Sequence, residues 1–200
     1  MARVTAKISW QQIQRKISKS RKLNQTLERA GRIKFNKMKK NLMKNFDNHL
    51  VTQEILGGST ASNVTDSLGG YGNLFSFVGF AEGSNPTSGV RALLESSVRL
   101  KISKRNETKK RLIGKEISIK LPTIKEFAPV GRMPYEGGNS WIEMIERGMS
   151  NFSHYMHKKT TASRSGAGIQ VKGRIRSGKS KPTLYMTELL EKFKKELRTK

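Results

Sequence analysis

The chain contains no cysteine, and its 15 acidic residues stand against 40 lysines and arginines. Without cysteine, disulfide bonds, thiolate metal sites and a cysteine nucleophile are excluded. The sequence has no apolar run long enough to span a bilayer and no apolar stretch behind its first charges, so we expect neither a membrane span nor secretion. Hydrophobic residues make up only 34% of the 200 residues, so we expect part of the chain to project from the core.

The positive charge is unevenly distributed. A formal net charge of +25 at pH 7 attracts phosphate polymers, anionic lipids or acidic protein surfaces, and it makes isolated copies repel one another. Residues 1–46 contain fourteen basic residues and one acid, Glu28, whereas Arg91 is the only basic residue between positions 47 and 98. We therefore expect a nearly neutral packing element in the middle of the chain and cationic segments on either side.

The N-terminal region has a helical pattern. Apolar residues recur at three- and four-residue steps from Ile8 to Asn48, which predicts one long helix. Its apolar stripe is narrow and the remainder is mostly basic, which is typical of a helix that packs on another subunit or lies along a charged surface; a solvated helix over its own core is the alternative. We divide the chain into a basic helical extension, 1–48, and a core, 49–200, with a basic loop at 104–111 and a C-terminal helix.

The core alternates between helical and strand patterns. Strand patterns are predicted at 74–80, 117–121 and 169–175, and helical ones at 85–102, at 141–156 and after Pro182. This order predicts an α+β fold with a small antiparallel or mixed sheet packed with helices, with parallel winding as the competing topology. The residues expected in the core or at an interface are Phe75, Phe77, Phe80, Trp141, Ile145, Phe152 and Phe193.

Residues 173–180 match the phosphate-binding pattern G-x-x-x-x-G-K-S. Such a loop opens a helix at its lysine, but Pro182 follows only two residues after the pattern. Phosphoryl transfer with magnesium also needs an acidic ligand, and no aspartate follows Asp66. We therefore interpret residues 173–180 as the basic end of a strand followed by a turn. A nucleoside triphosphatase that binds its substrate at this loop is the less favoured hypothesis.

Other candidates for chemistry are isolated. His154 and His157 are three residues apart on a predicted helix, but no third or fourth metal ligand lies near them in the sequence. His49 is interpreted as a local hydrogen-bonding residue or a residue at the C-terminal end of the long helix, rather than a base. Glu143 and Glu146 are interpreted as helix-surface residues or as partners of cations on a neighbouring subunit. We accordingly predict a protein that is not an enzyme and that has no catalytic residue, metal or cofactor.

The basic residues instead indicate a binding surface. The aromatic run at 74–80 lies in the least basic region of the chain, so the sequence does not favour stacking of aromatic side chains on single-stranded bases. It favours contacts between basic side chains and backbone phosphates. A basic RNA- or DNA-binding protein of ribosomal or nucleoid type, acting alone, is one function that fits. The basic residues expected to face DNA or a partner are Arg15, Lys16, Lys37, Lys39, Lys40, Lys109, Lys110, Arg111, Arg164, Lys172, Arg174, Arg176 and Lys179.

The chain resembles the tail-completion or neck proteins of tailed bacteriophages in the order of several sequence stretches. The likeness spans most of the chain and rests on the order of its motifs after a long N-terminal helix. These motifs are Leu68-Gly69-Gly70-Tyr71-Gly72-Asn73-Leu74-Phe75-Ser76-Phe77, Met133-Pro134-Tyr135, Trp141-Ile142-Glu143-Met144-Ile145-Glu146-Arg147-Gly148, Ser163-Arg164-Ser165-Gly166 and Lys181-Pro182-Thr183-Leu184.

The resemblance implies a structural role without catalysis. Members assemble into a homo-oligomeric ring at the head-to-tail junction of the virion, formed in the host cytoplasm, and packaged DNA passes through or stops in the lumen. The implied partners are the portal or connector protein, tail terminator or tail tube proteins and the backbone of genomic DNA, with no membrane. Trp141, Ile145 and the 74–80 strand would form the core. The long helix and C-terminal segment would contact ring neighbours or the connector.

Overall fold

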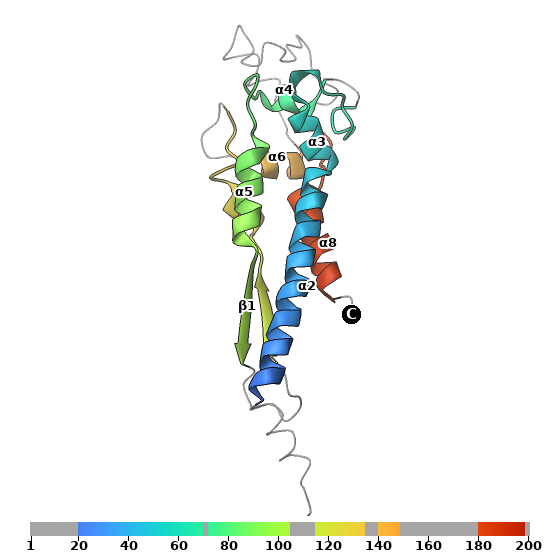
Figure 1. The fold of residues 1–200 in the computed structure, drawn as a ribbon. Coiled ribbons are helices and arrows are strands. Elements are labelled where there is room, and N and C mark those ends of the chain that lie inside the picture. The colour runs from blue at the N-terminus through green and yellow to red at the C-terminus, as the bar shows by residue number, and fades with distance from the viewer. Residues whose placement is uncertain (1–19, 70–71, 105–114, 135–139, 149–179, 199–200) are drawn as a thin grey trace, which may run out of the picture.

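The computed structural model describes residues 20–69, 72–104, 115–134, 140–148 and 180–198. Figure 1 shows an elongated molecule in which helix α2 runs along most of the length, with short helices at one end and a β hairpin at the other. The fold class is confirmed, because the described chain is mostly helical, with a long N-terminal helix and a two-stranded antiparallel sheet. The elements are α2 (Arg21–Asp47), α3 (Leu50–Leu56), η1 (Gly58–Thr60), α4 (Leu74–Val78), α5 (Thr87–Ser97), β1 (Arg99–Lys104), β2 (Lys115–Lys120), η2 (Ile124–Phe127), α6 (Trp141–Arg147) and α8 (Met186–Arg198).

Helix α2 begins at a capping residue. The backbone of Ser20 is extended, and its side-chain oxygen accepts a hydrogen bond from the Leu23 amide at 3.5 Å. The predicted helix is thus confirmed over Arg21–Asp47, while residues 8–19 lie outside the described residues. Its C-terminal half belongs to the core, because one face is buried at helical spacing. The buried residues are Phe35, Met38, Leu42, Met43 and Phe46.

The strand predicted at 74–80 is wrong, because residues Leu74–Val78 form helix α4. Asn73 caps this helix, with its side-chain oxygen accepting from the Ser76 amide at 2.9 Å. Gly79 ends it in the left-handed conformation, at φ +80°. All five residues of α4 are buried, so its apolar residues surround the helix and match neither a helical nor a strand period. The Phe75, Phe77 and Phe80 side chains are all in the core.

The helix predicted from residue 85 to residue 102 ends early. Helix α5 stops at Ser97, and β1 follows directly and pairs with β2 in antiparallel register, with Ile102 opposite Ile117. The sequence is ambiguous at this boundary, because Val98 and Ile102 have helical spacing whereas Leu100 and Ile102 have strand spacing. The strand predicted at 117–121 is confirmed as β2.

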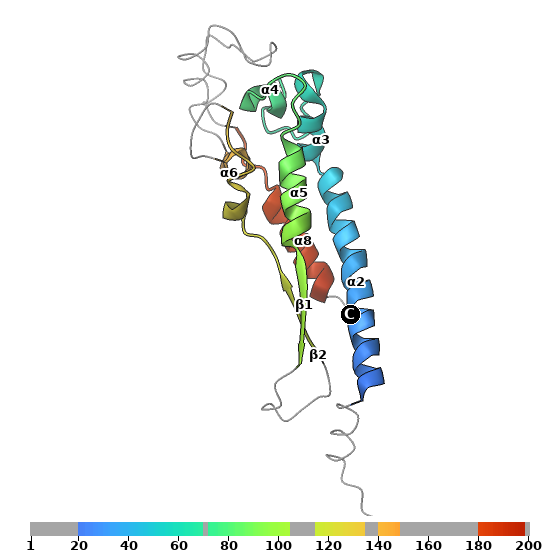
Figure 2. The same ribbon diagram turned by 60° about the vertical axis from the view of Figure 1, so that its left-hand side comes forward.

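The hairpin packs on the N-terminal half of α2, and α8 packs beside the C-terminal half (Figure 2). A glycine at the first contact allows the close approach. A Cβ atom placed on Gly31 would lie 2.9 Å from the Cδ1 atom of Ile117 in β2. A side chain at position 31 would therefore have to displace the flexible end of the Ile117 side chain.

Helices α6 and α8 complete the core. Trp141, Ile145 and Phe193 are buried, whereas Phe152 lies outside the described residues. The helix predicted over 141–156 ends at Arg147, because Gly148 has φ +76° and ψ 124° and cannot continue it. The strand predicted at 169–175 and the basic loop beyond Lys104 also lie outside the described residues. Within the described ranges, no helix combines the length and apolar character that crossing a bilayer requires.

Candidate functional site

The outer side of α2 is cationic. Arg29, Lys37, Lys40 and Lys44, which we call the α2 basic face, are exposed and lie opposite the buried side of the helix. Their side chains form no hydrogen bond or ion pair with any other residue that the structure describes. The exposed side chain of Ile33, with 61% of its surface accessible, lies among them. From position 29 to position 44 this face is about 22 Å long, at 1.5 Å per helical residue.

Few acids oppose this charge. Helix α2 contains nine basic residues and two acids, Glu28 and Asp47. Asp47 lies at the end of the helix, where it accepts from the Arg91 Nε atom at 2.8 Å. That hydrogen bond raises the pKa of Arg91. The excess of positive charge on α2 therefore remains available to a phosphate backbone or to an acidic protein surface.

Three of the predicted basic residues are on α2. Lys37 and Lys40 belong to the α2 basic face, whereas Lys39 is half-buried on a different side of the helix. The other predicted basic residues lie outside the described residues; they are Arg15, Lys16, Lys109, Lys110, Arg111, Arg164, Lys172, Arg174, Arg176 and Lys179. Arg29 and Lys44 were not predicted as site residues, although their helical spacing from Lys37 and Lys40 was visible in the sequence.

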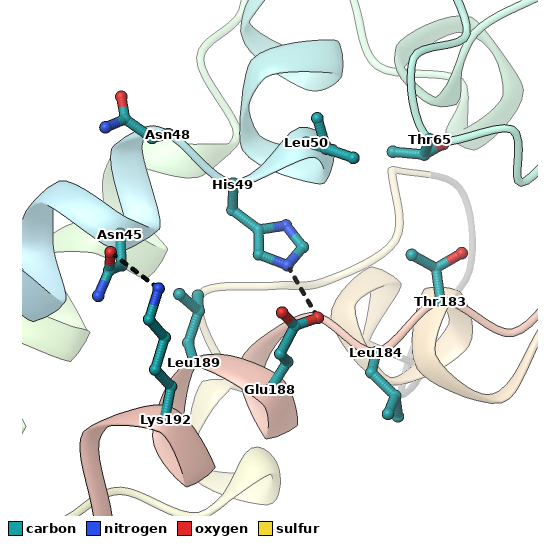
Figure 3. Close-up of a pocket in the computed structure, with 10 residues that line it drawn as sticks. All are labelled: Asn45, Asn48, His49, Leu50, Thr65, Thr183, Leu184, Glu188, Leu189 and Lys192. Atoms are coloured by element: carbon teal, nitrogen blue, oxygen red, sulfur yellow. Dashed lines mark hydrogen bonds and ion pairs between the residues drawn. The ribbon is translucent and has the colours of Figure 1, made fainter. Parts of the chain in front are cut away.

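A polar cleft of about 350 Å³ lies where α2, α3 and α8 meet (Figure 3). His49 is in this cleft as the N-cap of α3, and its Nδ1 atom accepts a hydrogen bond from the Val51 amide at 3.2 Å. Its Nε2 atom lies 3.8 Å from a carboxylate oxygen of Glu188. Lys192, also in the cleft, donates to the Asn45 side chain at 3.4 Å. The interpretation of His49 as a local hydrogen-bonding residue is confirmed.

The environment of His49 favours its neutral form. Burial lowers the pKa of His49, and the opposing attraction of Glu188 is too weak to reverse this effect. Because Nδ1 accepts the Val51 amide hydrogen, the neutral ring carries its proton on Nε2, on the side of Glu188. Protonation of Nδ1 would break the hydrogen bond that caps α3.

This arrangement predicts that acid weakens the fold through His49. The unfolded chain binds the proton more readily than the folded one, so stability from this group is present above pH 6.5 and is lost as the pH falls toward the lowered folded pKa. We expect His49→Asn, which keeps a capping side chain but does not titrate there, to remove this part of the pH dependence. Urea unfolding of both proteins across this range measures it. Identical pH profiles for the two proteins would rule out the mechanism.

The two glutamates of α6 have different roles. Glu143 pairs with Arg147 at 2.5 Å along the helix, in agreement with the predicted surface role. The surface or intersubunit role predicted for Glu146 is wrong, because its carboxylate accepts hydrogen bonds from the Tyr185 amide at 3.2 Å and the Thr187 amide at 2.8 Å. Glu146 therefore holds the start of α8 against α6. Its partners are about forty residues away in the sequence, so no local pattern indicated this role.

No group of three or more metal-ligating side chains occurs within the described ranges. His154, His157 and most of the phosphate-binding match lie outside those ranges. The last residue of the match, Ser180, is buried, and the next residue, Lys181, pairs with Asp66 at 2.5 Å.

A scan of known protein families and comparisons with curated proteins and with solved structures find no match to this chain.

Proposed function

We propose that this protein is a structural subunit of the bacteriophage neck, a ring component that joins the head connector to the tail and surrounds or retains packaged DNA. The observation that carries the proposal is the α2 basic face. One side of α2 packs into the core, and the other side presents four cations without partners among the described residues. A helix with one buried side and one basic side favours a rigid subunit that binds a polyanion. The resemblance in the order of the sequence motifs supports the same role.

The α2 basic face is compatible with assembly into a ring around DNA. Copies with this charge repel one another in solution, but the repulsion falls when they surround a polyanion that neutralises them. A face of about 22 Å matches the rise of roughly six base pairs of duplex DNA at 3.4 Å each. Phosphate contacts require no particular base sequence, as expected for a subunit through which a whole genome passes.

Neutralising the α2 basic face tests the proposal. We expect a variant with Gln at Arg29, Lys37, Lys40 and Lys44 to bind duplex DNA more weakly in the assembled state, with the slope of log affinity against log salt reduced by up to about four. In the virus, particles carrying this variant should fail to retain DNA. The measurements are DNA binding over a salt series and the DNA content of purified particles.

A matched control removes the same charge elsewhere. Lys101, Lys120, Lys125 and Arg132 are exposed and lie outside α2, so changing all four to Gln lowers the net charge equally. We expect this control to keep most of the salt slope and to retain DNA. Equal losses in the two variants would show that only total charge matters, which contradicts a specific role for the α2 basic face.

The same face also suits the second candidate, a nucleic-acid-binding protein that acts alone. That function predicts tight, salt-dependent binding of monomers to free duplex or structured RNA. A neck subunit is expected to bind weakly until it has assembled. The two proposals therefore differ in the oligomeric state that binds.

A further inference from the structure

A second hollow, of about 500 Å³, lies between α2, the hairpin and the C-terminal end of α8. Its lining is largely apolar and includes Phe35 and Met38 from α2, Ile119 from β2 and Leu197 from α8. The Ile117 side chain also lines this groove, yet 48% of its surface is accessible to solvent. Apolar surface that stays exposed beside a hollow is typical of a binding site.

The charged residues that line the groove, among those that the structure describes, all have one sign. They are Lys34, Lys194 and Arg198. Lys194 also pairs with Glu191 of its own helix at 2.6 Å. An occupant that buries apolar side chains here is therefore also attracted if it carries carboxylates beside them.

The hairpin presents side chains to the groove rather than a strand edge. Ile117 and Ile119 are two residues apart in β2, so they lie on one face of the sheet, and Leu100 of β1 is opposite Ile119 in the register. An extended peptide that adds a strand uses backbone groups at a sheet edge, whereas an amphipathic helix fills a groove lined by side chains.

We infer that this groove binds an acidic amphipathic helix from a different protein, with the apolar stripe of that helix on Ile117 and Ile119 and its carboxylates beside Lys34, Lys194 and Arg198. This chain is a poor source of such a helix. Its first 19 residues contain five basic residues and no acid, and the whole chain has only 15 acids. If the chain is a neck subunit, as proposed above, the occupant is a segment of the connector or of a tail protein.

The test uses a synthetic helical peptide with leucines at i, i+3, i+4 and i+7 and glutamates elsewhere. Its binding to the full-length protein is measured by fluorescence anisotropy at a salt concentration that screens loose ionic contacts. A peptide with the same composition in scrambled order has no apolar stripe. We expect it to bind at least about tenfold more weakly, because the groove recognises the stripe as well as the charge.

Two isoleucines give a matched pair of variants. Ile117→Glu changes the groove, and Ile33→Glu makes the same charge change at an exposed isoleucine among the α2 basic face. We expect Ile117→Glu to weaken peptide binding about tenfold or more and Ile33→Glu to change it less than about twofold. If Ile117→Glu does not fold, Arg198→Ala replaces it, with an expected loss of about threefold and Lys44→Ala as its control.

The outcomes separate the groove from the proposed function. Equal binding of the striped and scrambled peptides, or equal effects of Ile117→Glu and Ile33→Glu, would overturn the inference while leaving ring assembly untouched. A dimer of the free protein that Ile117→Glu converts to monomers, without peptide binding, would make a second copy the occupant and would also overturn it. Peptide binding by a protein that never forms a ring would support the groove and count against the neck.

Discussion

Replacing Trp141 with alanine is expected to lower the free energy of unfolding by about 3–5 kcal/mol, the usual cost of removing a large aromatic side chain from a packed core. Trp141 is 1% exposed. Its ring meets that of Phe80 edge-on at 5.7 Å between centroids and stacks on that of Tyr185 at 6.1 Å. It thus joins α6 to the segments before α5 and α8, and its loss leaves a cavity between them.

Denaturant unfolding followed by circular dichroism measures this effect, because the variant loses a fluorescent residue. Trp141→Phe is the control, since it keeps an aromatic ring and should lose less than half as much stability. A loss below about 1 kcal/mol for Trp141→Ala would contradict the central packing of this side chain.

Replacing Glu54 with leucine is expected to lower the free energy of unfolding by about 3 kcal/mol, because it leaves a buried and a half-buried amide group without acceptors. The carboxylate of Glu54 is 1% exposed and accepts hydrogen bonds from the Leu74 amide at 2.7 Å and the Thr65 amide at 2.9 Å. It thereby ties the start of α4 and the preceding loop to α3. The Asn73 side chain reinforces the same connection by donating to the Ser59 carbonyl oxygen at 2.8 Å.

We expect Glu54→Leu to destabilise the contact between the loop, α4 and α3 locally, as well as to lower the overall free energy of unfolding. Hydrogen exchange should speed up at Thr65 and Leu74 before the rest of the core opens. Glu82→Leu makes the same chemical change at an exposed position and should alter stability by less than about 0.5 kcal/mol. Unchanged exchange at Thr65 and Leu74 in Glu54→Leu would show that these hydrogen bonds do not hold the loop.

The sequence predicts α2, β2 and α8 because each of these elements has one buried side and one exposed side. Their apolar residues therefore recur with the period of the element, as Met186, Leu190 and Phe193 do in α8. Helix α4 has no exposed side, so its residues could not reveal a period. At the end of α5, Ile102 fits two periods at once, and only its pairing with Ile117 decides between them.

The candidate surfaces follow from composition only in part. The excess of lysine and arginine predicts a basic surface, but the sequence does not separate the half-buried Lys39 from the exposed Lys40. The roles of Glu54 and Glu146 depend on partners that are distant in sequence. The groove at Ile117 combines residues from two helices, the two strands and the segment after them, so no stretch of sequence contains it.

The oligomeric state of the full-length protein, measured together with its place in purified particles, tests the proposed function most directly. Size exclusion with light scattering at low and high salt gives the mass, and electron microscopy of purified particles of the proposed phage gives the position. The proposal predicts a closed ring of copies, or copies fixed at the head-to-tail junction. A protein that stays monomeric, is absent from particles and binds nucleic acid tightly at low salt would contradict it and favour the nucleic-acid-binding alternative.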